Sequence, residues 1–114
     1  RVASEDTGRI LENIVFIELA RRGGEVYYFE EKQECDFVVK NGEGAGYYAL
    51  QVCQELTDKS RRWEAGGLIA ACKRLLLTNG MILTDDQEWE EEVEGVKIRV
   101  LPVWRWLIIQ SSLL

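Results

Sequence analysis

Two stretches of the chain place apolar residues at the spacing of an α-helix. In residues 8–22, apolar side chains occupy nearly every side of a helical wheel, which predicts a mostly buried helix ended by Gly23-Gly24. The second predicted helix runs from about 60 to 76, with Ser60 as its N-cap. Within it, Gly66-Gly67 costs about 1 kcal/mol per glycine, so we expect this helix to pack closely on another backbone.

Short runs of β-branched, aromatic and other apolar residues predict five strands around these helices. They cover residues 25–30, 34–39, 47–54, 81–84 and 96–102, and a last helix begins at Val103. The glycine-rich segment 41–46 supplies the turn between the second and third strands. The first three strands are expected to pair as a meander, and the strand after the second helix to cross over and join them in parallel. Residues 1–114 therefore predict one α/β domain, a mixed β-sheet flanked by helices with an α-β-β-β-α-β core.

The negative charge of the chain is concentrated in one segment. The net charge is -6, and residues 85–94, "DDQEWEEEVE", contribute seven acids and no base. The remaining residues hold 13 acids against 14 bases and are close to neutral. We expect the acidic segment to be a solvated loop or a mobile hairpin. The alternative is an acidic flap that mimics phosphate or docks a basic partner.

The composition excludes several classes of chemistry. Histidine is absent, which removes the usual zinc ligand and the usual base of nucleophilic catalysis. The three cysteines, Cys35, Cys53 and Cys72, form neither a disulfide framework nor a C-x-x-C zinc motif. No stretch of 18 apolar residues or signal peptide is present, so we expect a cytoplasmic protein with no membrane partner. Because the sequence begins with Arg1, we expect it to be a piece of a longer chain.

Polar side chains interrupt the second and third predicted strands. If Lys40 pairs with Tyr47 across the turn, the constant antiparallel register places Asp36 opposite Gln51. Alternation then puts both side chains on one face, where Glu12 of the first helix can join them. Two carboxylates, an amide oxygen and a main-chain carbonyl form a set of hard oxygen ligands that suits Mg²⁺ or Mn²⁺.

Four ordered motifs, "GRILENIVFIEL", "ECDFVV", "ALQVCQEL" and "VLPVWRWL", resemble a family pattern over most of the chain. The family is a C-terminal domain of unknown function in prokaryotic AAA+ ATPases, and it resembles in turn the PD-(D/E)XK nuclease fold, which is restriction-endonuclease-like. The resemblance implies that this chain is the C-terminal part of a longer ATPase. The Walker A pattern is absent, so the ATPase domain itself would be a partner outside this sequence.

The same resemblance assigns roles to four residues and shows two departures from the nuclease pattern. Glu12 stands for the helix acid and Asp36 for the strand aspartate of the metal site. Gln51 and Cys53 stand where the glutamate and the lysine of E-x-K are expected. A neutral amide attracts Mg²⁺ less than a carboxylate does, and a thiol supplies no fixed positive charge. Any bound Mg²⁺ or Mn²⁺ is therefore expected to bind weakly.

Two further surfaces are candidates for binding. Lys59, Arg61 and Arg62 cluster at the start of the second helix, where they could meet the phosphates of a nucleic acid or form a solvated basic face. The "WRW" segment at 104–106 is either core and helix cover or a docking surface for the missing ATPase domain.

The sequence thus favours a degenerate, non-catalytic nuclease-fold module that serves interaction or weak nucleic-acid binding. The alternatives are a Mg²⁺-dependent DNA or RNA endonuclease that uses Glu12, Asp36 and Gln51, and a pure protein-interaction domain. The substrate, the oligomeric state and the task of the parent ATPase do not follow from the sequence.

Overall fold

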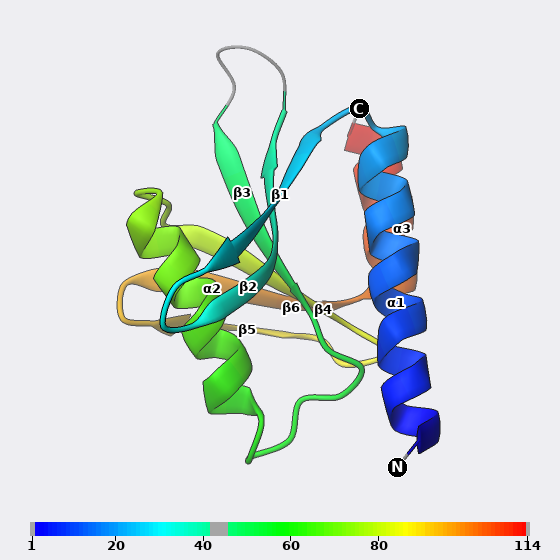
Figure 1. Cartoon of the computed structure of the whole chain (residues 1–114), viewed down its shortest axis with the longest axis horizontal. Coiled ribbons are helices and arrows are strands. Elements are labelled where there is room, and N and C mark those ends of the chain that lie inside the picture. Colours follow the sequence, from blue (N-terminus) through cyan, green and yellow to red (C-terminus); the bar gives the residue numbers. More distant parts are fainter. Residues whose placement is uncertain (1, 42–45, 114) are drawn as a thin grey trace.

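The protein is a mixed six-stranded β-sheet with helices on both faces, as a computed structural model shows (Figure 1). The structure describes the backbone of residues 2–41 and 46–113 and the side chains of residues 7–41 and 46–109. The helices are α1 (Val2–Arg21), α2 (Arg61–Arg74) and α3 (Val103–Leu113). The strands are β1 (Glu25–Glu30), β2 (Glu34–Lys40), β3 (Tyr47–Val52), β4 (Asn79–Thr84), β5 (Trp89–Val93) and β6 (Val96–Pro102). The predicted α/β class and the predicted layering of helices on a mixed sheet are therefore confirmed.

The two faces of the sheet carry separate apolar cores. Helix α2 covers one face, and its Leu68 and Cys72 pack with Val38, Ile82 and other buried residues there (the α2 core). Helices α1 and α3 cover the opposite face, as Figure 1 shows. Buried residues of this second core (the α1 core) include Leu11, Val15, Leu19, Val39, Leu50, Leu83 and Trp106. Asp36 lies on β2 and Gln51 on β3, between these two cores.

The predicted strand pairing is confirmed where the strands are described. The sheet order is β1-β2-β3-β4-β6-β5, with β1, β2 and β3 as an antiparallel meander. Lys40 pairs with Tyr47 as expected, and this register continues to the pair Phe37–Leu50. Strand β4 joins β3 in parallel after the α2 crossover. Of the predicted turn 41–46, residues 42–45 lie outside the described residues.

A β-bulge in β2 changes the alternation of side chains along this strand. Tyr27 of β1 pairs with Val38, but Phe29, two residues on, pairs with Cys35, so two residues of β2 oppose one residue of β1. As a result Cys35 and Val38 both pack in the α2 core, although strict alternation assigns them to opposite faces. Strict alternation of side chains therefore does not hold through the bulge.

Of the two forms expected for the acidic segment 85–94, the structure shows the hairpin and not the loop: the segment contains the edge strand β5, which pairs with β6. The mobility of this hairpin stays a prediction. Alternate side chains of β5 face the α2 core, and Trp89 and Val93 pack against it. Several of its acids are paired with bases on other elements, for example Glu91 with Arg61 and Glu94 with Lys73. The sequence did not predict this strand, because Glu91 places an acid between Trp89 and Val93 on the inward face and so interrupts the apolar alternation.

Helix α1 starts earlier than predicted and is less buried than predicted. Its buried side consists of Leu11, Val15 and Leu19. Ile10, Ile14, Phe16 and Ile17 are instead exposed, with Ile17 at 65%. The expectation of a mostly buried helix is wrong because α1 lies on the outside of the sheet and contacts it along one stripe only. None of the helices within the described residues is long and apolar enough to cross a membrane.

Candidate functional site

The candidate site lies where β2 and β3 stop pairing through their main chains. Beyond the pair Phe37–Leu50, two side chains take over the contact between the strands. The main-chain N–H of Asp36 donates to Gln51 Oε1 at 2.8 Å, and the N–H of Val52 donates to Asp36 Oδ2 at 2.8 Å. Asp36 and Gln51 are therefore neighbours, as the register predicted, and each side chain bonds to the backbone of the other strand.

Gln51 connects three elements of the fold. Its Nε2 donates to the main-chain carbonyl of Glu34 in β2 and to that of Glu64 in α2, both at 3.0 Å. Together with the bond from Asp36, these contacts use both amide protons and one lone pair of the amide oxygen. The side chain is 3% exposed, so its hydrogen bonds are made inside the protein. Gln51 therefore holds β2, β3 and α2 at a fixed separation.

The prediction that Asp36 and Gln51 share one face of the sheet is wrong. Gln51 contacts α2, whereas Asp36 lines a cavity of about 270 Å³ together with Glu12 and Phe16 of α1 and Phe37 of β2. The bulge in β2 is the physical reason, because it turns Asp36 and Phe37 toward the same side. Glu12 accordingly approaches Asp36 but lies on the side of the sheet opposite α2, to which Gln51 bonds.

A third carboxylate, Glu64, completes the cluster and was missed in the sequence. Burial raises the pKa of the Glu64 carboxyl to about 7, with smaller contributions from the charges of Asp36 and Glu12. Burial and the charge of Asp36 raise the pKa of Glu12. Burial also raises the pKa of Asp36, although the bond from Val52 opposes this rise. The sequence could have indicated Glu64 only through its position in the first turn of the second helix. That this turn lies near Asp36 follows from the fold and not from the sequence.

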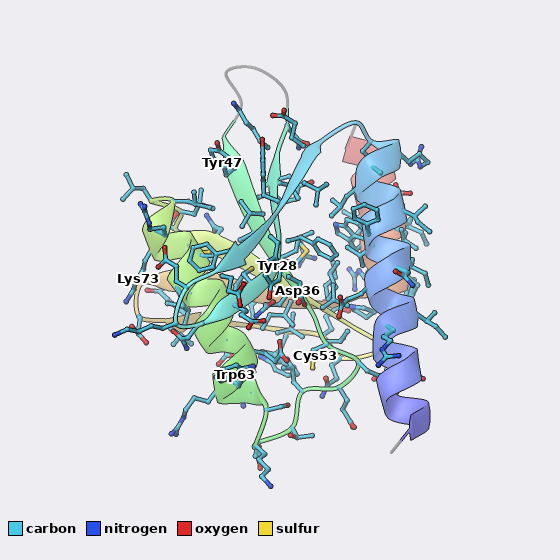
Figure 2. All side chains as sticks on the ribbon, viewed as in Figure 1. Tyr28, Asp36, Tyr47, Cys53, Trp63 and Lys73 are labelled. Atoms are coloured by element: carbon cyan, nitrogen blue, oxygen red, sulfur yellow. The ribbon has the colours of Figure 1, made fainter. Side chains whose placement is uncertain are left out.

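The position expected for a lysine holds a thiol with no charge. Burial raises the pKa of Cys53 to about 11, and the charge of Glu64 contributes to the rise. Its Sγ donates to the main-chain carbonyl of Glu55 at 3.3 Å. Figure 2 shows Cys53 and Asp36 in the middle of the view, between α2 and α1. Among the described residues, no hydrogen bond or ion pair joins Cys53 or Asp36 to a basic side chain.

The oxygen ligands expected for Mg²⁺ or Mn²⁺ are only partly free. The amide oxygen of Gln51 is engaged by Asp36, and one oxygen of Asp36 is engaged by Val52. In the part of the chain that the structure describes, no three Asp, Glu or Cys side chains are grouped in a way that could hold a metal ion. Weak binding through Glu12 and Asp36 stays a prediction for solution measurement.

The three basic residues at the start of α2 have different surroundings. Arg61 donates to Glu91 of β5 at 2.7 Å, and its guanidinium lies 5.3 Å from the centre of the Trp89 ring. Lys59 and Arg62 are exposed. The predicted cap residue Ser60 precedes the helix, but its side chain makes no capping bond and contacts Thr57 instead. Phosphate binding by this cluster remains a prediction.

The "WRW" segment divides between core and surface. Trp106 is 1% exposed and packs in the α1 core, whereas Trp104 is 59% exposed.

The guanidinium of Arg22 lies 4.5 Å from the centre of the Trp106 ring and forms an ion pair with Glu18 at 2.6 Å. The Arg22 side chain is 7% exposed and belongs to the packed interface between α1 and α3.

Comparison with known proteins adds one relative to this description. No family model matches the chain. A protein of Methanocaldococcus jannaschii named "Uncharacterized protein MJ1544" is 34% identical over 114 aligned residues, which cover 90% of this chain. The chain spans 25% of the length of that relative. The relative therefore shares a segment of this kind within a longer polypeptide.

The raised pKa of Glu64 predicts a pH dependence of stability. Because the folded state holds this proton up to about pH 7 and the unfolded state only to about pH 4.5, the contribution of Glu64 to stability is greatest below the lower value. It is lost as pH rises through this window. We therefore expect Glu64→Gln to stabilise the protein at pH 8 and to change little at pH 4, as measured by urea unfolding at both pH values. Glu55→Gln, at an exposed acid, serves as the control. Equal stability of Glu64→Gln and the parent at pH 8 would contradict the assignment.

Proposed function

We propose that this chain is a non-catalytic module with a nuclease-like fold, which acts in protein interaction or weak nucleic-acid binding within a longer cytoplasmic AAA+ ATPase. The observation that supports this proposal most is the set of hydrogen bonds of Gln51. At the place where a metal-binding glutamate is expected, the side chain bonds three main-chain groups and stabilises the fold. The Gln51 amide thus donates both of its protons and accepts one bond within the protein, and it is 3% exposed, which is the arrangement of a structural side chain.

Electrostatics support the same proposal. Hydrolysis of a phosphodiester develops negative charge, and preorganised positive charge near the reacting phosphate is usually the largest catalytic term. The cluster of Glu12, Asp36 and Glu64 is negative, and Cys53 is neutral at physiological pH. This arrangement repels a phosphate unless a cation neutralises it.

One observation favours the second candidate, a Mg²⁺-dependent endonuclease. The charge of Asp36 raises the pKa of both Glu12 and Glu64, and acids whose pKa values are raised by a neighbouring carboxylate are common at functional sites. Glu12 and Asp36 would hold the ion, and the ion would supply charge neutralisation and lower the pKa of a bound water. The third candidate, a pure protein-interaction domain, is favoured by the exposed apolar side chains of α1, such as Ile10 and Ile17.

A cleavage assay with supercoiled plasmid distinguishes the first two candidates. We expect no nicking by the purified chain in Mg²⁺ or Mn²⁺, and only weak heat in a calorimetric Mn²⁺ titration. Asp36→Asn is the control for the cluster, and Glu55→Gln is the control for an acid outside it. Metal-dependent nicking that disappears in Asp36→Asn but persists in Glu55→Gln would replace the proposed function by the endonuclease.

A further inference from the structure

Strand β5 is a free edge of the sheet with unpaired main-chain groups. It pairs with β6 on one side and ends the sheet order on the other. The hairpin turns through Glu94 and Gly95, both with positive φ, so Val93 and Val96 form the hydrogen-bonded pair that closes it. Alternation of the antiparallel ladder then directs the N–H and C=O groups of Glu90 and Glu92 away from β6. These groups can accept a further strand.

A groove lies beside this edge. Its volume is about 510 Å³, and it is bordered by α2 on one side and β5 on the other. Its walls include Arg61, Ala65, Ile69 and Lys73 from α2 and Glu91 and Val93 from β5. Ion pairs join the two walls near the ends of α2, Arg61 to Glu91 at 2.7 Å and Lys73 to Glu94 at 2.6 Å. Figure 2 shows Lys73 on the side of α2 that faces away from α1.

The lining has an order that suits an extended peptide. Trp89, Glu91 and Val93 are the residues of β5 that face α2, since Trp89 and Val93 pack in the α2 core. Side chains of an added strand would alternate in the same way, so that every second one would point into the groove beside Ala65 and Ile69. The remaining side chains would lie next to Glu90 and Glu92 on the opposite face.

The charge of this edge selects one kind of peptide. Glu90 and Glu92 are exposed, and on the β6 side they pair with Arg99 and Lys97. The free side offers them no base within the described ladder. Opposite charges at directly facing positions stabilise a strand pair, and like charges destabilise it. On the β6 side, Glu90 and Glu92 face basic residues. An added strand with lysine or arginine at alternate positions would place basic residues opposite them on the free side as well.

We propose that β5 binds a basic, extended peptide segment of a partner protein as a seventh strand, with its alternate small apolar side chains in the groove beside α2. This mode of recognition combines main-chain hydrogen bonds for affinity with pockets for alternate side chains for specificity. The proposal names a kind of partner for the protein-interaction role proposed above, and its biological meaning rests on that role. Pairing of β5 with a second copy of itself is disfavoured, because it would bring acidic residues opposite one another.

The test uses a fluorescent peptide in which lysine and valine alternate, and two matched peptides. One matched peptide replaces lysine by glutamate, and the other carries N-methyl groups on alternate amides. We expect saturable binding of the basic peptide by anisotropy, with shifts of β5 amides in NMR spectra. The acidic and the N-methylated peptides should each bind at least about tenfold more weakly, because charge or main-chain donors are lost.

Two protein variants locate the site. Glu90→Lys with Glu92→Lys should weaken the basic peptide by about tenfold or more. The control, Glu25→Lys with Glu30→Lys, makes the same charge change on exposed positions of the other edge strand, β1, and should leave binding within about twofold.

Each contrary outcome overturns the proposal. These outcomes are absence of binding, equal binding of the N-methylated peptide, larger loss in the β1 control, binding of single-stranded nucleic acid in preference to the peptide, and β5-mediated dimers that exclude it. Plasmid nicking is measured separately and reports only on the carboxylate cluster. Failure of the peptide experiment and failure of the proposed function are therefore distinguishable.

Discussion

Gly67→Ala is expected to destabilise the protein by about 3 kcal/mol, because a Cβ at this position has no space. The added atom would lie 1.9 Å from the main-chain oxygen of Glu34 and 2.8 Å from Gln51 Nε2. The oxygen belongs to the backbone of β2 and cannot rotate away, so α2 must move off the sheet. That movement would also lengthen the bond from Gln51 to the carbonyl of Glu64.

The helical glycines of this chain provide matched controls for Gly67→Ala. A Cβ at Gly8 of α1 meets nothing within 4 Å, so Gly8→Ala should stabilise the protein by up to about 1 kcal/mol through helix propensity. At Gly66 the nearest atom is the end of the flexible Gln33 side chain, which can move, so a smaller loss is expected. Urea unfolding of the three variants checks the order. A Gly67→Ala protein as stable as the parent would show that α2 does not pack this closely on β2.

Gln51→Met is the second substitution with a large expected effect. Methionine has a similar length but cannot bond to the N–H of Asp36 or to the carbonyls of Glu34 and Glu64. Leaving one partly buried polar group unsatisfied costs about 1–3 kcal/mol, so a total loss of about 3 kcal/mol is expected after relaxation. The measurement is the midpoint and slope of urea unfolding. Gln54→Met, at a less buried neighbouring glutamine, should cost less than about 1 kcal/mol.

Gln51→Glu separates the structural role of this residue from a role in metal binding. A carboxylate would place negative oxygen beside the two carbonyls that now receive protons from Nε2, so the variant should be less stable than the parent at pH 8. Protonation restores one donor, so the difference should shrink at pH 4. A contrary result is that millimolar Mn²⁺ stabilises Gln51→Glu but does not stabilise the double variant Asp36→Asn with Gln51→Glu. That result would show that position 51 retains the geometry of a metal site.

Most helices and strands could be predicted, because short stretches of sequence carry the patterns that form them. Strands 25–30 and 34–39, the crossover through the second helix and the start of the last helix at Val103 were all predicted within one residue or nearly so. The pairing of Lys40 with Tyr47 also followed, since a short turn between two strands fixes their register. The close packing of α2 on another backbone, which the structure shows at Gly67, could be predicted because glycines are costly in a helix interior.

The sequence by itself determined the class of fold, the order of the elements and the neighbourhood of Asp36 and Gln51, because periodicity and register act between residues close in the chain. Only the tertiary structure decided on which face of the sheet each site side chain lies. The bulge in β2 turned Asp36 toward α1, the packing of α2 brought Glu64 to the carboxylates, and the approach of α2 to β5 created the groove. These features depend on contacts between elements distant in sequence, and their energies come from burial and geometry that no local pattern encodes.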